Sequence, residues 1–367
     1  MKTKTSVLKK LKASKPKQWT NKNPLWKGPV EDGITRSMLA LFLVCRERFR
    51  IKYILGLQPH DKWNHRIGYG DMWHECEETL LEGGDWYTRL QLFASNLIQE
   101  YPTQRNEIEK WFNVCKRQFE VYLEHWDNIK SMKRSGFEVL GQEVEFNFLY
   151  DDYILLRGKI DGVLWNSKTS TLVIQENKTK GDIDEESLRQ QLSFDLQTMT
   201  YLTAAINIYS ELKPKKFGVL YNVIRRPLSG GKYSISQLQN VNRGKKGANG
   251  KPLPKREETN TEYYDRLQGL IREDSKFFFC RWDVEVEKQD IDKFKKECLS
   301  PILEELAHWY EDIIHGENSG HWRTPYGLYN PMAEGRMGDV DNFLNTGNTA
   351  GLKRVDRLFP ELKEEKR

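Results

Sequence analysis

The chain of 367 residues contains no apolar run long enough to cross a bilayer. Its first residues are basic, but they lack the apolar segment of a secretion signal. Its five cysteines are an odd number and no two stand in C-x-x-C spacing, so a disulfide framework is not expected in a chain of this length. We therefore expect a cytoplasmic protein without a membrane partner.

Acidic residues are missing from two stretches, residues 1–27 and residues 225–256, although the net charge of the whole chain is only +5. Basic patches of this kind favour a polyanion through counterion release. For residues 1–27, a solubilising tail explains the charge equally well. The sequence also has no internal repeat, no P-loop and no helicase motif, so any ATP-driven step would need a partner.

The length permits one large domain or two, and we expect one domain with flanking segments. Residues 1–30, with three prolines, are expected to be a basic flexible tail. The domain itself is expected over residues 31–320, with a helical insertion at 85–135 and a basic flexible loop at 225–260. Residues 321–367 are expected to be irregular.

The stretch that carries the chemistry begins with two strand-like runs, Tyr153–Trp165 and Thr171–Glu176, joined by a polar turn. Asp161 lies on the first run and Glu176 ends the second, so on paired strands the two carboxylates can converge. Hard oxygen ligands suit Mg²⁺ or Mn²⁺. Lys178 lies two residues beyond Glu176 and points to the same face of its strand, where it could orient a water for phosphodiester hydrolysis.

Two predicted helices add polar side chains to this set. A helix from about Asp184 carries Gln197 and Tyr201 four residues apart, on one face. Another helix is predicted to begin near Gly70-Asp71, which would place His74 close to its positive end. A zinc pair of His74 with Glu78 is a weak alternative, because no second histidine is near.

The ordered set of Asp161, Glu176-Asn177-Lys178 and Gln-x-x-x-Tyr resembles the PD-(D/E)xK nuclease superfamily. His74 upstream and the Cys45 helix bring the chain closest to the RecB-type branch, which includes phage exonucleases and CRISPR adaptation nucleases. The resemblance implies that one or two Mg²⁺ or Mn²⁺ ions are bound by His74, Asp161, Glu176 and the main-chain carbonyl of Asn177. It implies that Lys178 activates the water and that Gln197 and Tyr201 steady the phosphate backbone or Lys178.

Many members of the resembled branch hold an iron–sulfur cluster on an early cysteine and three cysteines near the C-terminus. Cys45 stands at the early place, but the C-terminal fifty residues contain no cysteine. Cys280 and Cys298 come too early and too widely spaced to substitute. We therefore expect no cluster, and Cys45 is predicted to be a small buried apolar residue.

The remaining site predictions concern a strand and several cations. The strand Phe137–Tyr150 carries Glu143 and Glu145; Glu145 could support or add a metal ligand, although a solvated glutamate is the stronger interpretation. A helix from Ile34 shows an apolar stripe and an arginine face. The candidate nucleic-acid contacts are Arg46, Arg50, Arg225, Arg226, Lys245 and Lys246.

The expected fold is α/β, a restriction-endonuclease-like core with a mixed sheet of four or five strands flanked by helices. The expected function is a divalent-metal-dependent DNA nuclease of the phage or bacterial recombination type, an exonuclease before an endonuclease. Single- or double-stranded DNA is the expected partner, with a recombination or helicase protein as a possible second one. A DNA-binding accessory subunit that does not cut, and an endonuclease with a structure or sequence preference, remain alternatives. RNA-directed cleavage, polarity and oligomeric state stay open.

Overall fold

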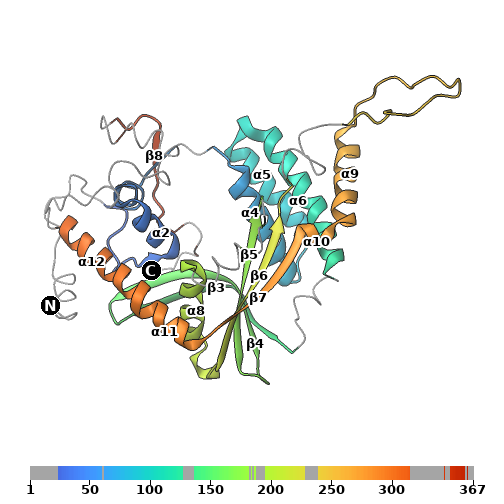
Figure 1. The fold of residues 1–367 in the computed structure, drawn as a ribbon. Coiled ribbons are helices and arrows are strands. Elements are labelled where there is room, and N and C mark those ends of the chain that lie inside the picture. Colours follow the sequence, from blue (N-terminus) through green and yellow to red (C-terminus); the bar gives the residue numbers. More distant parts are fainter. Residues whose placement is uncertain are drawn as a thin grey trace.

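A mixed six-stranded sheet forms the centre of the protein (Figure 1). The computed structural model describes residues 24–59, 62–126, 136–181, 183, 186, 195–227, 239–314, 343, 348–359 and 362. The strands of the sheet are β1 (Ile34–Thr35), β3 (Glu138–Tyr150), β4 (Ile154–Asn166), β5 (Thr171–Lys180), β6 (Lys216–Arg225) and β7 (Phe279–Val286). The expected α/β fold is confirmed, although the sheet has six strands where four or five were predicted.

The sheet order is β1-β4-β5-β6-β7, and β3 also pairs with β4. The β3–β4, β4–β5 and β6–β7 pairs are antiparallel, whereas β5 and β6 run parallel. A parallel pair needs a crossover, and here α8 (Leu196–Ile208) lies between the two strands in the chain. The two apolar runs that were predicted as strands are β4 and β5, and β6, which begins at Lys216, lies beside β5.

Helices pack on both sides of the sheet around two separate hydrophobic cores (Figure 1). The first core joins the strands to α2 (Arg36–Val44), α8, α11 (Lys288–Phe294) and α12 (Ser300–Ile314). The second core is built from α4 (His65–Leu81), α5 (Trp86–Glu100), α6 (Arg105–His125), α9 (Asn260–Glu273) and α10 (Ser275–Phe278), with the adjoining ends of β6 and β7. The aromatic residues between Trp86 and Trp126, within the helical insertion expected at 85–135, therefore serve mainly as core packing.

The helix predicted from Ile34 is interrupted at Cys45. Thr35 caps α2 by accepting from the backbone N–H of Met38, and the backbone at Cys45 is extended, with φ −163°. The chain then continues as α3 (Arg46–Phe49) and a π-helical turn, Arg50–Ile54. Cys45 is buried, in agreement with its predicted role as a small apolar residue.

The helix that carries His74 begins earlier than predicted. Asn64 caps α4, and His74 lies in the middle of the helix. The prediction of a start at Gly70-Asp71 is wrong because Gly68 and Gly70 serve close packing and do not end the helix. A Cβ at Gly68 would stand 2.3 Å from Trp63 Nε1, and one at Gly70 would stand 3.2 Å from Thr179 Oγ1 of β5. The position of His74 therefore comes from α4 lying against β5, and the helix dipole has no part in it.

Both flanking segments enter the fold further than predicted. Residues 24–30 pack on the domain, with Trp26 fully buried and the Pro29 carbonyl accepting from the backbone N–H of Leu155 at 2.9 Å. Near the other end of the chain, β8 (Leu352–Arg354) pairs antiparallel with β2 (Leu57–Pro59), within the region expected to be irregular. Residues 1–23 and most of 315–347 lie outside the described part, so the rest of both predictions stays untested.

The loop expected at residues 225–260 also differs. Residues 239–258 form a hydrogen-bonded hairpin that projects from the N-terminal end of α9 (Figure 1). Residues 228–238 lie outside the described part. Among the helices that the structure describes, none is long and apolar enough to span a membrane.

Trp26→Ala should lower the free energy of unfolding by about 3–5 kcal/mol, as for other buried tryptophans. The indole packs edge-on against Phe49 and Tyr310, at centroid distances of 5.2 and 5.0 Å, and donates to the Gly33 carbonyl at 2.8 Å. Urea denaturation measures the change. The control Lys27→Ala removes an exposed side chain and should stay within about 0.5 kcal/mol. Equal effects of the two variants would show that residues 24–30 are not part of the fold.

Candidate active site

Asp161 and Glu176 lie where β4 and β5 separate. The pairing of the two strands runs from Asn166 opposite Thr171 to Gly162 opposite Gln175. Asp161 and Glu176 are the next residues beyond that last pair. Glu176 continues beside β6, in register with Tyr221, while the first half of β4 pairs with β1. The two carboxylates predicted to converge are therefore placed at a fork between strands.

A backbone hydrogen bond closes this fork. The N–H of Asn177 donates to Asp161 Oδ2 at 2.8 Å. The side chain of Asn177 turns inward, where its Oδ1 accepts from Gln175 and from Asn222. The structure thus fixes the Asn177 backbone directly beside Asp161. Its carbonyl, which the resemblance assigns as a metal ligand, stays a proposal.

Three ligand-type side chains meet at Asp161. One ligand atom each of His74, Glu143 and Asp161 lies within 4.8 Å of the other two. They come from α4, β3 and β4, which are separate elements of the chain. An imidazole with two carboxylates is a ligand set that divalent cations use. This group is a possible acidic metal site.

Glu143, and not Glu145, is the β3 glutamate that joins the group. Gln142 pairs with Gly162 and Val144 with Ile160, so Glu143 falls opposite Asp161. Its backbone lies in the left-handed region, with φ 48°, which is a strained conformation for a residue with a side chain. Glu145 is exposed. Sequence reasoning noted both glutamates but had no means to detect the backbone distortion.

Glu176, Lys178 and Gln197 form a closed triangle beside the group. The Lys178 ammonium contacts Glu176 Oε1 and donates to Gln197 Oε1 at 3.0 Å. The Gln197 amide donates to the same Glu176 oxygen at 2.7 Å. The structure therefore brings together the predicted Glu-x-Lys pair and the first residue of the predicted helix motif.

The second oxygen of Glu176 shows how the site fits a cation. Glu176 is 1% exposed, and its Oε2 is buried with no hydrogen-bond partner among the described residues. A buried carboxylate oxygen without a partner is costly, and a bound cation would remove that cost. The side chains of His74, Glu143, Asp161 and Glu176 therefore fit a divalent metal ion.

Burial and mutual repulsion shift the acidity of both strand carboxyls. Burial raises the pKa of Asp161 to about 6; the Asn177 N–H acts against this and Glu143 adds to it. Burial raises the pKa of Glu176 to about 7, with the Asp161 charge adding to the rise and Lys178 opposing it. Without a cation, these carboxyls keep their protons to a higher pH than free carboxyls do, and metal binding releases any proton that they still hold.

A cavity of about 490 Å³ opens over the group. Tyr201 lines it together with His74, Glu143 and Asp161. The N-terminal end of α2 also lines it, through Thr35, Arg36 and Ser37. Arg36 approaches Asp195 at 4.0 Å, and its Nε is buried with no partner in the described part of the chain. Sequence reasoning missed Arg36, because it looked for cations further along this segment.

A buried polar network supports the site from below. The Asn222 amide of β6 donates to Asn177 Oδ1 at 3.0 Å and to Glu77 Oε1 at 3.0 Å. Tyr122 of α6 donates to the same Glu77 oxygen at 2.7 Å, and Arg281 of β7 donates to Asn222 Oδ1 at 3.2 Å. Glu77 is one turn beyond His74 on α4, so the network ties the His74 helix to the strand of Asn177.

The six cations predicted to contact nucleic acid differ in their exposure and in their partners within the fold. Arg46 pairs with Glu305, and Arg50 pairs with Glu47 at 2.5 Å. Arg225 stacks on Phe277 and donates to its carbonyl. Arg226 is 6% exposed and donates to the Arg66 carbonyl, so it does not offer a surface contact. Lys245 and Lys246 are exposed on the 239–258 hairpin.

Comparison with known families agrees with this geometry. Residues 34–298, well over half of the chain, match the model of the PD-(D/E)XK nuclease superfamily. The chain belongs to that superfamily of metal-dependent nucleases. The matched range includes every residue of the group described above, and the family implies a nucleic-acid substrate. No curated protein is similar enough to match the chain.

In the absence of divalent cations, the protein should lose stability as the pH rises from about 4 to about 7. The folded state holds protons on Asp161 and Glu176 that the unfolded state has already released, so its relative stability falls over this window. Thermal unfolding in EDTA across pH 5–8 measures the trend. Asp161→Asn should flatten it and make the metal-free protein more stable than wild type at pH 8. If the unfolding temperature of the wild-type protein rises between pH 5 and pH 7, the explanation by burial of the two carboxyls is contradicted.

Proposed function

We propose that the protein is a divalent-metal-dependent DNA nuclease that hydrolyses phosphodiester bonds, and that it acts as an exonuclease. The observation that carries the proposal is the convergence of His74, Glu143 and Asp161 beside Glu176. Glu176 is buried, and its Oε2 has no hydrogen-bond partner among the described residues. Membership of the nuclease superfamily supports the reaction class.

We assign the cation, Mg²⁺ or Mn²⁺, to His74, Glu143, Asp161 and Glu176, with the Asn177 carbonyl as a further ligand. A divalent ion at this place would supply a Lewis acid that stabilises negative charge developing on the phosphate. The proposed set adds Glu143 to the ligands predicted from the sequence.

The remaining residues act through charge and position. Lys178 is held by Glu176 and Gln197, so its ammonium is oriented toward the site, where it can position the attacking water. Arg36 lines the cavity from the N-terminal end of α2, and its buried Nε has no hydrogen-bond partner among the described residues. We assign its guanidinium to a phosphate oxygen. Tyr201 lines the same cavity and can donate to the phosphate backbone.

The RecB-type branch supports the exonuclease assignment. Cys45, His74, Asp161, Glu176-x-Lys178 and Gln197-x-x-x-Tyr201 follow in the order of that branch, and exonucleases are among its members. A role in recombination, repair or DNA processing, with a helicase or recombination partner, follows from the same resemblance and belongs to the proposal.

The test is digestion of end-labelled linear duplex, single-stranded DNA and a closed circle, with Mg²⁺ or Mn²⁺ and with EDTA. Wild type should shorten linear DNA and spare the circle, and EDTA should abolish the reaction. Asp161→Ala should lower the rate at least about a thousandfold, because loss of the cation removes several kcal/mol of charge stabilisation. Asp292→Ala, an exposed carboxylate on α11, is the matched control and should cut normally.

Cleavage of the circle would replace the exonuclease assignment by an endonuclease. DNA binding without cleavage in any divalent metal would favour an accessory subunit and would overturn the catalytic assignments. An active Asp161→Ala variant would show that the reaction does not depend on the fork between β4 and β5.

A further inference from the structure

Residues 239–258, called the finger here, form a hairpin with an unusual composition. Between Gln239 and Arg256 there are six Lys or Arg residues and no Asp or Glu. The finger also contains no aromatic residue. Nearly all of its side chains are exposed or only partly buried, so it has no hydrophobic cluster of its own. Hairpins without such packing are only marginally stable.

Backbone bonds and asparagine side chains nonetheless hold the finger in one shape. The two arms are joined by two isolated antiparallel bridges, Asn240 with Glu257 and Lys246 with Pro252. The Val241 N–H donates to the Arg256 carbonyl at 2.9 Å, and the Leu253 N–H donates to the Lys245 carbonyl at 3.0 Å. Asn240 Oδ1 accepts from the Arg256 backbone N–H, and the Asn242 amide donates to the Pro254 carbonyl at 2.7 Å. The tip, from Gly247 to Lys251, is closed by the Gly247 N–H donating to the Lys251 carbonyl.

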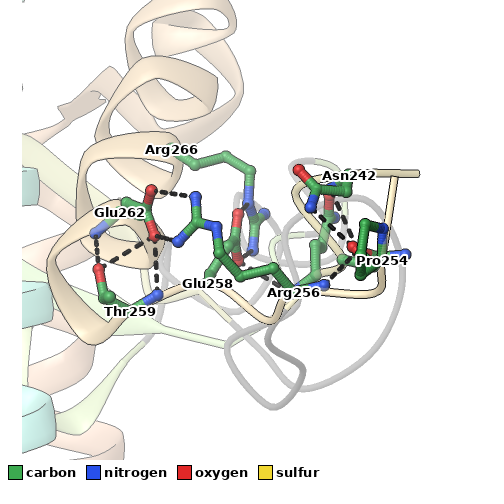
Figure 2. Close-up of polar contacts among 9 residues, drawn as sticks. Asn242, Pro254, Arg256, Glu258, Thr259, Glu262 and Arg266 are labelled. Carbon is green, nitrogen blue, oxygen red and sulfur yellow. Dashed lines mark hydrogen bonds and ion pairs between the residues drawn. The ribbon is translucent and has the colours of Figure 1, made fainter. Parts of the chain in front are cut away.

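Two bidentate ion pairs fasten the base of the finger to α9 (Figure 2). Arg266 of α9 holds Glu258, and Glu262 of α9 holds Arg256, with N–O distances from 2.6 to 2.9 Å. Thr259 and Glu262 also form a capping box at the start of the helix. Since α9 packs into the second core, the finger is joined to the nuclease domain through a defined helix.

The charge of the finger is concentrated beyond this base. At the base, the acidic residues Glu257, Glu258 and Glu262 form ion pairs with Lys255, Arg266 and Arg256, respectively. Arg243, Lys245, Lys246 and Lys251 are exposed, and none of them makes an ion pair with any residue that the structure describes. The exposed hairpin, which projects from α9 in Figure 1, therefore presents four cations beyond its base.

We propose that the finger is a duplex-binding element that contacts the phosphates along the major groove of B-form DNA. That groove is wide enough to admit two antiparallel chain segments, whereas the major groove of A-form RNA is too narrow. Proteins that bind single strands stack bases on aromatic side chains, and the finger has none. The contacts supply affinity that is independent of sequence. This inference rests on the proposed function in that it names duplex DNA as the substrate that reaches the site.

The test neutralises the tip with Arg243→Gln, Lys245→Gln, Lys246→Gln and Lys251→Gln. The matched control neutralises four exposed cations, three on the segments that precede β5 and β6 and one on the first residue of β6: Lys168→Gln, Lys213→Gln, Lys215→Gln and Lys216→Gln. Fluorescence anisotropy in EDTA measures binding to a labelled duplex of about 20 base pairs and to a single strand of equal length, over a salt series. The absence of metal keeps the DNA uncut.

The salt dependence of duplex binding should weaken in the finger variant. The slope of log K against log salt should become less negative by roughly 3 to 4, since each phosphate contact contributes about 0.9. Duplex affinity should fall at least tenfold at about 100 mM salt, with a much smaller change on the single strand. The control variant should keep the wild-type slope, and the single change Lys246→Gln should shift it by about 0.9.

A finger variant with the slope of the control would overturn the proposal, and an equal loss on single-stranded DNA would overturn the assignment to duplex. Unchanged thermal unfolding verifies that the variant is folded. The two proposals can fail separately. If the protein binds duplex DNA through the finger but never cleaves it, only the nuclease proposal is wrong. If the protein cleaves DNA and the finger variant keeps the wild-type salt slope, only the finger proposal is wrong.

Discussion

Two carboxylates at a fork between strands, the half-buried Asp161 and the buried Glu176, are the constraint on which the rest of the site depends. Asp161 and Glu176 stand just beyond the last pair of β4 with β5, and burial and mutual repulsion raise the pKa of both. Charged together in an apolar setting, they would destabilise the fold unless a cation lay between them. The unpartnered oxygen of Glu176 is the visible part of that cost. The two carboxylates therefore lower the stability of the metal-free fold at the site where we propose that catalysis occurs.

The surrounding fold holds this arrangement in place. Asn177 bridges the fork to Asp161 through its N–H, and its side chain is gripped from below by Asn222. Through Asn222 and Glu77 the same network reaches α4, so the helix of His74 and the strand of Asn177 are positioned by one set of buried hydrogen bonds. Hydrogen bonds buried in this way position the groups that they join.

The strands and their chemistry could be predicted from the sequence because both are local signals. Runs rich in Ile, Leu and Val, separated by a polar turn, gave β4 and β5, and the Glu-x-Lys spacing gave a shared face for Glu176 and Lys178. Long-range features could not be predicted. The glycines near His74 indicated a helix start, but Gly68 and Gly70 are there for tertiary packing. The choice of Glu143 over Glu145 depends on a left-handed backbone that leaves no mark in composition.

The most direct test of this account is Mn²⁺ binding by titration calorimetry with the two β3 glutamates exchanged separately. Glu143→Gln should weaken binding at least tenfold, because it removes a carboxylate that lies with His74 and Asp161. Glu145→Gln, two residues away on the same strand and exposed, should bind as wild type does. If both variants bind Mn²⁺ like wild type, or if only Glu145→Gln is weakened, the metal site is not the one proposed at the fork.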